Sequence, residues 1–321
     1  MELLAAVEKR IQDDNIKNIR FEFLDTNAVA RSKTIPARHF KSTATSGILF
    51  PAGVDIECVE TEYAKGQFEL VICPTFGIKA ADNAATFRTG VKEMAMRNGF
   101  VASFMSKPYP KEGGSSGHLN HSLWSLDGKT PKTGDSSRPY GLSEIGEHWI
   151  AGLLEHAPAL SFLQSPTVNC RDRVKPDTFA PFNATWGVDN RTCAVRLKPV
   201  GAHGIYMENR MGSSAGNPYI SLAATIAAGI DGSNVSYLFH LQYRLTSHLI
   251  LLNTFPDTAL LPADMEAAFQ ALKKDEILVS AIGADLVDAL ESVRRLEMTT
   301  FAADSDVEKF ELHRRMYFDY V

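Results

Sequence analysis

The most informative stretch of the chain is Met207-Glu208-Asn209-Arg210, which is followed after Gly212 by Asn217-Pro218-Tyr219. If residues 204–210 form a strand, side chains alternate between its faces, so Glu208 and Arg210 lie on the same face. A carboxylate beside a guanidinium on a rigid element can hold a divalent cation with one group and a phosphate-like anion with the other. A simple ion pair at the surface is the alternative interpretation.

Helix signals follow this strand directly. Asn217 can cap a helix and Pro218 suits its first turn, so we predict a helix to Ile230, closed by Gly232. Periodicity predicts further elements along the chain. The predicted strands are 16–25, 29–35, 101–105, 121–126, 185–197 and 204–211, with a second hairpin over 54–72 that turns at 64–66. The predicted helices are 1–13, 82–98, with Gly99 as its C-terminal stop, and 142–164, followed by two or three within 263–321.

The composition is that of an ordinary globular protein. Of its residues, 45% are hydrophobic and 22% are charged. The length of 321 residues is enough for one large domain or two smaller ones. The net charge is -5 and no basic stripe is visible, so nucleic acid is excluded as an expected partner. We expect no membrane span either, because the apolar stretch 235–255 is interrupted by His240, Arg244 and His248.

The cysteines and the N-terminal residues indicate the cellular compartment of the protein. The four cysteines are scattered without CxxC spacing, which argues against zinc and fits free thiols in a reducing compartment. The first residues, Met1-Glu2-Leu3-Leu4, lack the basic start and long apolar core of a signal peptide. We therefore expect a cytoplasmic protein.

Two upstream motifs carry groups that suit a metal. Glu62 and Glu69 fall on opposite arms of the predicted hairpin, and two carboxylates brought together by a turn repel each other unless a cation lies between them. The loop Gly113-Gly114-Ser115-Ser116-Gly117 ends at His118, where glycines allow close approach of the backbone to a phosphate and histidine can ligate a metal. Exposed acids at a strand edge and an ordinary connecting loop are the alternatives.

An arginine set lies downstream of these motifs. Its members are Arg173, Arg191, Arg196 and Arg210. Arg191 and Arg196 fall on opposite faces of a regular strand, so they serve one ligand only if a bend separates them. Arginines facing acids and a metal suit phosphoryl transfer, where charge on the moving group must be neutralised. A structural network of ion pairs is the alternative.

Taken together, these segments resemble the glutamine synthetase family. The likeness is carried by the segments 62–69 (EYAKGQFE), 107–118 (KPYPKEGGSSGH), 121–124 (HSLW), 190–196 (NRTCAVR) and 208–219 (ENRMGSSAGNPY). Within the family, the segments 31–37, 81–93 and 149–156 resemble the non-catalytic lengsin branch. The resemblance implies a ligase that joins glutamate to ammonia or an amine, as in glutamine biosynthesis. Such a ligase uses ATP together with Mg²⁺ or Mn²⁺.

The resemblance also implies metal ligands. Glu62 and Glu69 match ligands of the metal that holds glutamate, whereas His118 and Glu208 match ligands of the metal on the ATP phosphates.

Further roles follow from the same resemblance for the arginines and one serine. Arg173 and Arg191 match arginines near glutamate and the transferred phosphate, and Arg210 matches the arginine beside the metal-binding glutamate. Arg196 and Ser122 match positions that contact the nucleotide.

The sequence departs from the family pattern at several positions. Residues 41–53 replace a long stretch that completes a β-grasp domain and carries an E-x-E strand with one ligand for each metal. The flap glutamate aligns with Phe179 and a histidine of the H-x-H motif with Asn120. We therefore expect weakened metal sites and weak or lost ligase activity. The hypothesis that the chain is a shortened splice form or an incomplete gene model can be tested by sequencing the full-length transcript.

The expected fold is α+β, with a reduced β-grasp-like unit over 1–53 and a glutamine-synthetase-type catalytic domain over 54–321. The family forms homo-oligomeric double rings, which the shortened N-terminal unit would disfavour. The first functional interpretation is a glutamate–ammonia or glutamate–amine ligase. The second is a non-catalytic lengsin-type structural or chaperone protein that binds intermediate filaments. Retained acids and arginines favour the first, whereas Phe179 and Asn120 favour the second.

Overall fold

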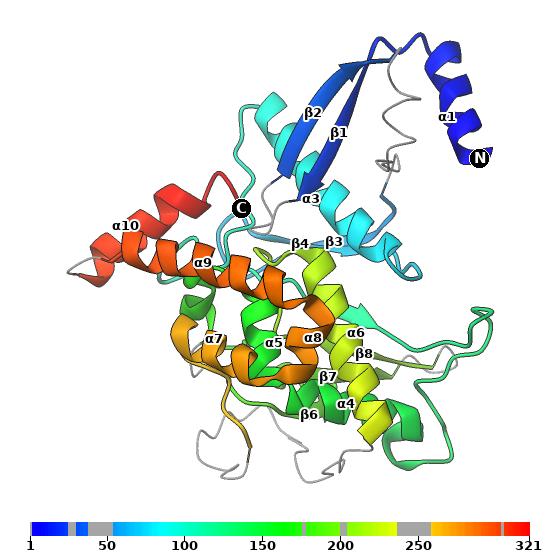
Figure 1. Cartoon of the computed structure of the whole chain (residues 1–321), viewed down its shortest axis with the longest axis vertical. Helices are drawn as coiled ribbons and strands as arrows, with labels where there is room; N and C mark the ends of the chain where they lie inside the picture. The colour runs from blue at the N-terminus through cyan, green and yellow to red at the C-terminus, as the bar shows by residue number, and fades with distance from the viewer. Residues whose placement is uncertain are drawn as a thin grey trace. The chain divides into compact units, whose positions relative to one another are not determined.

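The computed structural model describes residues 2–24, 30–37, 54–174, 178–199, 204–235, 258–302 and 305–321. Two compact units can be distinguished, one formed by Met1–Glu60 with Glu69–Ala102 and the other by Thr61–Phe68 with Ser103–Val321. Both helices and strands are present, which confirms the predicted α+β class (Figure 1). The predicted domain boundary at residue 53 stays a prediction.

The first unit begins with the helix and hairpin expected from the sequence. Helix α1 spans Glu2–Asp13, and strands β1 (Asn18–Leu24) and β2 (Ala30–Pro36) pair antiparallel. The predicted turn between these strands falls outside the described residues. Helix α3 (Lys79–Arg97) ends where predicted, because Gly99 has a φ of 74° that favours glycine.

The second hairpin is also confirmed. Strands β3 (Ile56–Thr61) and β4 (Phe68–Ile72) form a two-stranded sheet. The turn between them is closed by hydrogen bonds from Glu62 N–H to Gln67 O (3.0 Å) and from Gln67 N–H to Ala64 O (3.1 Å).

A four-stranded sheet lies within the second unit, in the order β5-β8-β7-β6. Its strands are β5 (Leu119–His121), β6 (Trp186–Val188), β7 (Val195–Pro199) and β8 (Ile205–Asn209). Strand β8 pairs antiparallel with both β5 and β7, so the residues opposite Glu208 are Asn120 on one side and Arg196 on the other.

The prediction of one strand over 185–197 is wrong. Strands β6 and β7 run parallel. After β6 the chain must therefore return to the level of Trp186 before β7 begins at Val195. Asn190 closes this turn by accepting hydrogen bonds from the N–H (2.9 Å) and hydroxyl (2.8 Å) of Thr192, and Asp189 has a φ of 53°. Polar turn chemistry therefore overrides the strand propensity of the flanking residues, and it supplies the bend between Arg191 and Arg196.

Other predicted elements are shorter or absent. Residues 101–105 form no strand, and the strand expected over 121–126 ends at His121. The predicted helix 142–164 is two helices, α4 (Glu144–Glu155) and α5 (Ala157–Gln164), because Pro158 cannot donate the hydrogen bond that would continue α4. Short 3₁₀ turns occupy Pro139–Gly141 and Val168–Arg173.

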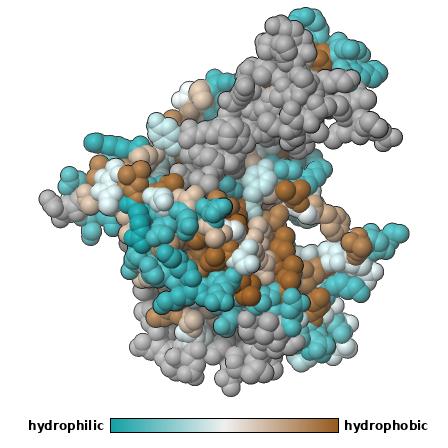
Figure 2. Space-filling model, viewed as in Figure 1, coloured by the Kyte–Doolittle hydropathy of each residue, from teal (hydrophilic) through white to brown (hydrophobic). Residues whose placement is uncertain are grey.

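Helices pack around this sheet (Figure 1). The C-terminal helices are α7 (Met265–Lys274), α8 (Glu276–Ile282), α9 (Ala284–Thr300) and α10 (Asp306–Tyr317), more than the two or three predicted, and Tyr317 of α10 packs in a second, smaller hydrophobic cluster. The extra helix arises where the Asp275 side chain caps α8 directly after α7 ends. Figure 2 shows hydrophilic side chains over α7, α8 and α9, whereas α6 presents a hydrophobic face with exposed Ile226 and Ile230.

Helix α6 (Pro218–Val235) begins at the predicted cap. Asn217 Oδ1 accepts hydrogen bonds from the N–H groups of Tyr219 (3.0 Å) and Ile220 (3.4 Å). We expect Asn217→Ala to lower the free energy of unfolding by about 1 kcal/mol, and Asn217→Ser to recover most of it. Urea unfolding followed by circular dichroism measures both. Equal midpoints for the alanine variant and the unchanged chain would contradict the capping role.

Helices α4 and α6 cross at backbone contact. A Cβ added at Gly152 would lie 2.2 Å from Ala228 O, and one added at Gly232 would lie 2.3 Å from His148 O. A Cβ at Gly229 would lie 2.2 Å from the Trp149 ring. Only glycine fits at these positions, so the crossing depends on them.

A buried histidine joins several helices. His156, between α4 and α5, bonds through Nδ1 to Asp275 Oδ2 (2.7 Å) and through Nε2 to Asp231 Oδ2 (3.1 Å). Asp231 belongs to α6 and Asp275 caps α8. Burial alone lowers the pKa of His156, but the hydrogen bonds to both aspartates outweigh it and raise the pKa.

None of the helices within the described ranges combines the length and apolar character that crossing a bilayer requires.

Candidate active site

The centre of the candidate site is Glu208 on β8. Its carboxylate is 5% exposed, and the sheet register places it between strands β5 and β7. A buried carboxylate needs partners, because its desolvation is otherwise costly. The partners come from the strand beside it and from the residue two positions further along the chain.

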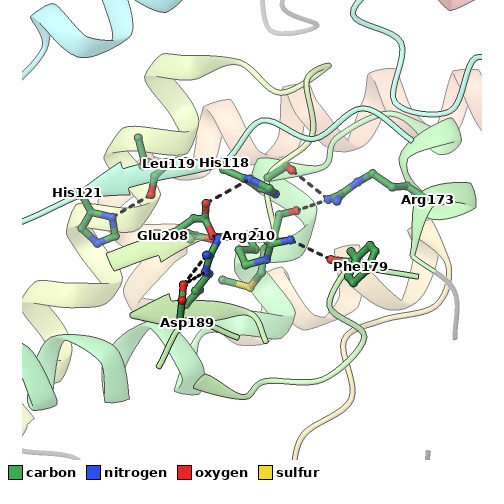
Figure 3. A network of polar contacts seen from close by, with 12 residues as sticks. His118, Leu119, His121, Arg173, Phe179, Asp189, Glu208 and Arg210 are labelled. Atoms are coloured by element: carbon green, nitrogen blue, oxygen red, sulfur yellow. Dashed lines mark hydrogen bonds and ion pairs between the residues drawn. The ribbon is translucent and has the colours of Figure 1, made fainter. Parts of the chain in front are cut away.

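Two arginines hold the carboxylate (Figure 3). Glu208 Oε2 accepts hydrogen bonds from Arg210 Nη1 (2.8 Å) and Arg196 Nη1 (3.3 Å). Arg196 also donates through Nε to Asp189 Oδ1 (3.1 Å), and Arg210 donates through Nη2 to the main-chain oxygen of Phe179 (3.1 Å). The shared face of Glu208 and Arg210 is as predicted from the alternation of strand side chains.

The second oxygen of this carboxylate faces a histidine. His118 Nδ1 lies 3.7 Å from Glu208 Oε1, which is too long for a hydrogen bond. Burial, and then the charges of Arg210, Arg173 and Arg196, hold the pKa of His118 well below 6.5. The imidazole is therefore neutral near pH 7, in the form that ligates metals.

A neutral imidazole and an ionised carboxylate oxygen are a chemically suitable donor pair for a divalent cation. Among the residues that the structure describes, no His, Cys, Asp or Glu completes a group of three around a metal position. A cation held by His118 and Glu208 would need its remaining ligands from water or a bound substrate, as is common for Mg²⁺.

Arg173 adds charge, and among the described residues it forms no ion pair with a carboxylate. Its Nη2 donates to the main-chain oxygens of Met211 (3.1 Å) and Gly212 (3.0 Å), and its Nε is buried without a partner. Burial, together with the nearby charges of Arg210 and Arg171, lowers the pKa of Arg173 to about 10. It remains a cation at neutral pH, so it can bind an anion.

Arg191 lies at the exposed end of the same region. Within the described residues its guanidinium makes no hydrogen bond or ion pair, although its charge lowers the pKa values of Arg210 and Asp189. The turn after β6 places it there. Arg173, Arg191, Arg196 and Arg210 therefore outnumber the paired carboxylates Glu208 and Asp189.

The glycine-rich loop reaches the site through close packing. Gly117 N–H donates to Gly212 O (3.0 Å), and a Cβ at Gly212 would lie 2.3 Å from Gly117 O. This contact lays the loop on the segment that follows Arg210 and delivers His118 to Glu208. Close packing alone therefore explains the glycines at positions 117 and 212, whether or not the loop binds a phosphate.

Glu62 belongs to the same unit, and among the described residues its side chain makes no hydrogen bond or ion pair with this cluster. The turn that follows it is tied to the glycine-rich loop, because Gln67 Nε2 donates to Gly114 O (3.0 Å) and Ser115 Oγ (3.1 Å). Glu69 belongs to the other compact unit, so its pairing with Glu62 in one metal site stays a prediction. Ser122 Oγ accepts from Trp124 Nε1 (2.9 Å), and no hydrogen bond links it to Glu208 within the described chain.

Sequence reasoning missed two partners in the site. Asp189 pairs with Arg196, and Phe179 provides a carbonyl to Arg210. The ring of Phe179 also lies against Tyr63, with centroids 6.2 Å apart. The Asp-Asn pair at 189–190 is a turn signal that could have revealed the first, whereas no local pattern marks the second.

Comparisons with known proteins give a consistent result. A family model described as "Glutamine synthetase, catalytic domain" matches residues 36–315. Lengsin from Rattus norvegicus is 36% identical over 267 residues, covering 82% of this chain and 46% of lengsin. Glutamine synthetase from Methanococcus maripaludis is 31% identical over 251 residues, covering 78% of this chain and 56% of that protein. The chain thus spans about half the length of these relatives.

A third relative, similar over fewer residues, is named after an amine as the partner of glutamate. Glutamate–isopropylamine ligase from a Pseudomonas species is 36% identical over 181 residues, which are 56% of this chain and 39% of the ligase. Among solved structures, one described as a GmaS/ADP complex superposes with a TM-score of 0.82 at 21% identity, covering 94% of this chain and 98% of that one. A structure described as a novel glutamine synthase homolog superposes with a TM-score of 0.73 at 28% identity, covering 98% of this chain and 74% of that one, so the fold is of the glutamine synthetase type.

Proposed function

Since the chain belongs to the glutamine synthetase family, we propose that it joins the side-chain carboxylate of glutamate to ammonia or an amine with ATP as the energy source. The observation that carries this proposal is the buried Glu208 carboxylate held by Arg196 and Arg210 beside a neutral His118. We further propose a slow reaction, because residues 41–53 replace the long stretch in which the family carries its E-x-E strand, and Phe179 stands at the flap position.

The reaction has two steps. A γ-carboxylate oxygen of glutamate attacks the γ-phosphorus of ATP, the bond to the bridging oxygen breaks, and ADP leaves. The nitrogen of ammonia or the amine then attacks the γ-carbonyl carbon, phosphate leaves with the C–O bond electrons, and the nitrogen loses one proton. The first step transfers an anionic phosphoryl group and the second releases anionic phosphate, so fixed cations nearby lower both barriers.

The arginines supply these cations. Within the described residues, Arg173 donates to neutral carbonyl oxygens and Arg191 is exposed without an ion pair, so both charges are available to an anionic substrate. Arg196 and Arg210 share one carboxylate and are held in place by it. This fixed geometry avoids reorganisation when charge develops in the transition state.

His118 and Glu208 would hold a divalent cation, Mg²⁺ or Mn²⁺, which would neutralise charge on the ATP phosphates. The proposal keeps Glu62 and Glu69 as ligands for a second cation and Ser122 as a nucleotide contact. The four free cysteines suit the reducing cytoplasm in which we propose that the reaction takes place.

Arg191→Ala gives a direct test. Because this side chain is exposed and unpaired in the described structure, we expect the free energy of unfolding to change by less than about 0.5 kcal/mol. ADP release with glutamate and ammonia or an amine should fall by about 100-fold. Arg295→Ala is the matched control, since this exposed arginine on α9 pairs with Glu266 and Glu291 instead. Full activity of Arg191→Ala would contradict its role.

The whole proposal is tested by comparing the chain with Glu208→Ala. ADP release that depends on glutamate and on the nitrogen donor should exceed that of the variant. If the two rates are equal, the ligase proposal is wrong.

Lengsin supports a second candidate function. Its similarity covers most of this chain, and a non-catalytic assembly role, with homo-oligomers or intermediate filaments as partners, would need neither metal nor ATP. Calorimetry distinguishes the candidates. Saturable Mg²⁺–ATP binding favours the ligase, whereas no binding combined with co-sedimentation with filaments favours the structural role.

A further inference from the structure

Two aromatic side chains stand exposed beside the cluster of Glu208, Arg196 and Arg210. Tyr63 is 77% exposed and Phe179 is 48% exposed. Their ring centroids are 6.2 Å apart, and their planes are inclined by 30°. Rings at this separation attract each other but leave most of their surface open to water. Such a surface gains free energy when an apolar ligand covers it.

Both rings start from fixed backbone. The turn that carries Tyr63 is held by Gln67, whose side-chain Oε1 accepts from Ala64 N–H (3.0 Å) and whose Nε2 bonds the glycine-rich loop. The main chain of Phe179 is held by Arg210 (3.1 Å), as Figure 3 shows. A ligand that binds here therefore meets rings that are already positioned, which reduces the entropy lost on binding.

We propose that Tyr63 and Phe179 bind the apolar substituent of the nitrogen donor, so that the chain prefers a primary amine with an aliphatic or aromatic group over ammonia. This inference rests on the proposed ligase function, because the nitrogen of that amine attacks the γ-carbonyl carbon of phosphorylated glutamate. The bond to phosphate breaks in that step, and the amine nitrogen releases one proton.

The position of Phe179 favours the amine over the base of ATP as the occupant. The Phe179 carbonyl contacts Arg210, whose guanidinium contacts Glu208, so the ring belongs to a residue at the proposed reaction centre. In ATP the base is separated from the reacting phosphorus by the ribose and two more phosphates. The substituent of an amine, by contrast, is bonded to the reacting nitrogen itself.

The test measures ADP release by the full chain with ATP, glutamate, Mg²⁺ and a series of nitrogen donors. The series is ammonium, methylamine, isopropylamine and benzylamine. We expect kcat/KM to rise with the apolar area of the donor, by about tenfold between methylamine and benzylamine. The product is confirmed as the γ-glutamyl amide by mass spectrometry.

Variants identify the rings as the cause. Phe179→Ala and Tyr63→Ala should each lower the ratio of kcat/KM for benzylamine to that for ammonium by about tenfold. Tyr63→Phe keeps the ring and should keep the ratio. Tyr320→Ala, which removes an exposed ring near the C-terminus, is the matched control.

The possible failures are distinguishable. A preference for ammonium in the unchanged chain, or an unchanged ratio in both alanine variants, overturns the inference and leaves the ligase function in place. No ADP release above Glu208→Ala with any donor overturns the ligase function and this inference with it.

Discussion

Gly152→Ala is expected to destabilise the chain by more than about 3 kcal/mol, at the upper end of what overpacking costs. The added Cβ would lie 2.2 Å from Ala228 O and 2.8 Å from Gly232 Cα, so it meets backbone atoms that cannot rotate away. Helices α4 and α6 would have to separate, which would also loosen the contact of Trp149 with Gly229. A loss of this size is a large part of the 5–15 kcal/mol that typically stabilises a domain.

Chemical unfolding monitored by tryptophan fluorescence measures this effect. Gly90→Ala on α3 is the matched control, because a Cβ there would meet nothing within 4 Å. That variant should be neutral or slightly stabilising, since alanine favours the helix over glycine by about 1 kcal/mol. A Gly152→Ala protein as stable as the Gly90→Ala protein would show that α4 and α6 do not cross as described.

His156→Ala is expected to cost about 3–5 kcal/mol at pH 6, because it leaves Asp231 and Asp275 buried without the cation between them. The pKa of His156 is higher in the folded chain than in the unfolded one. Its contribution to stability is therefore complete below the unfolded value of about 6.5 and is lost as the pH rises through the folded value. The difference between the two proteins should shrink at alkaline pH.

Thermal unfolding at pH 6 and pH 9 tests this dependence. His148→Ala is the control, since His148 lies on the same helix but takes no part in the pair of aspartates. If the stability lost in His156→Ala is the same at both pH values, the charged bridge is not its cause.

Local patterns in the sequence predicted the features that depend on neighbouring residues. Alternation along a strand placed Glu208 and Arg210 on one face, and they form an ion pair of 2.8 Å. The helix cap at Asn217 and the stop at Gly99 are likewise properties of a few adjacent residues. In each case the physical cause acts within one turn or one strand, so a single sequence suffices.

Features that depend on tertiary pairing were not predictable. The return of β7 parallel to β6 requires the sheet, since strand propensity alone favours a continuous element over 185–197. His156 meets aspartates that are far away in the chain, and Phe179 reaches Arg210 through a main-chain oxygen that any residue could supply. Such contacts leave no periodic signal in the sequence.

The pairing of β5 with β8 has a consequence for how the protein folds. Asn120 lies opposite Glu208, so the ends of a very long loop must meet before His118 can approach the carboxylate. Closing such a loop is entropically costly, and sheets built from distant segments form late and slowly. If the proposed function is right, nucleotide bound beside Glu208 would report on molecules that have finished folding, because partly folded intermediates would not retain it.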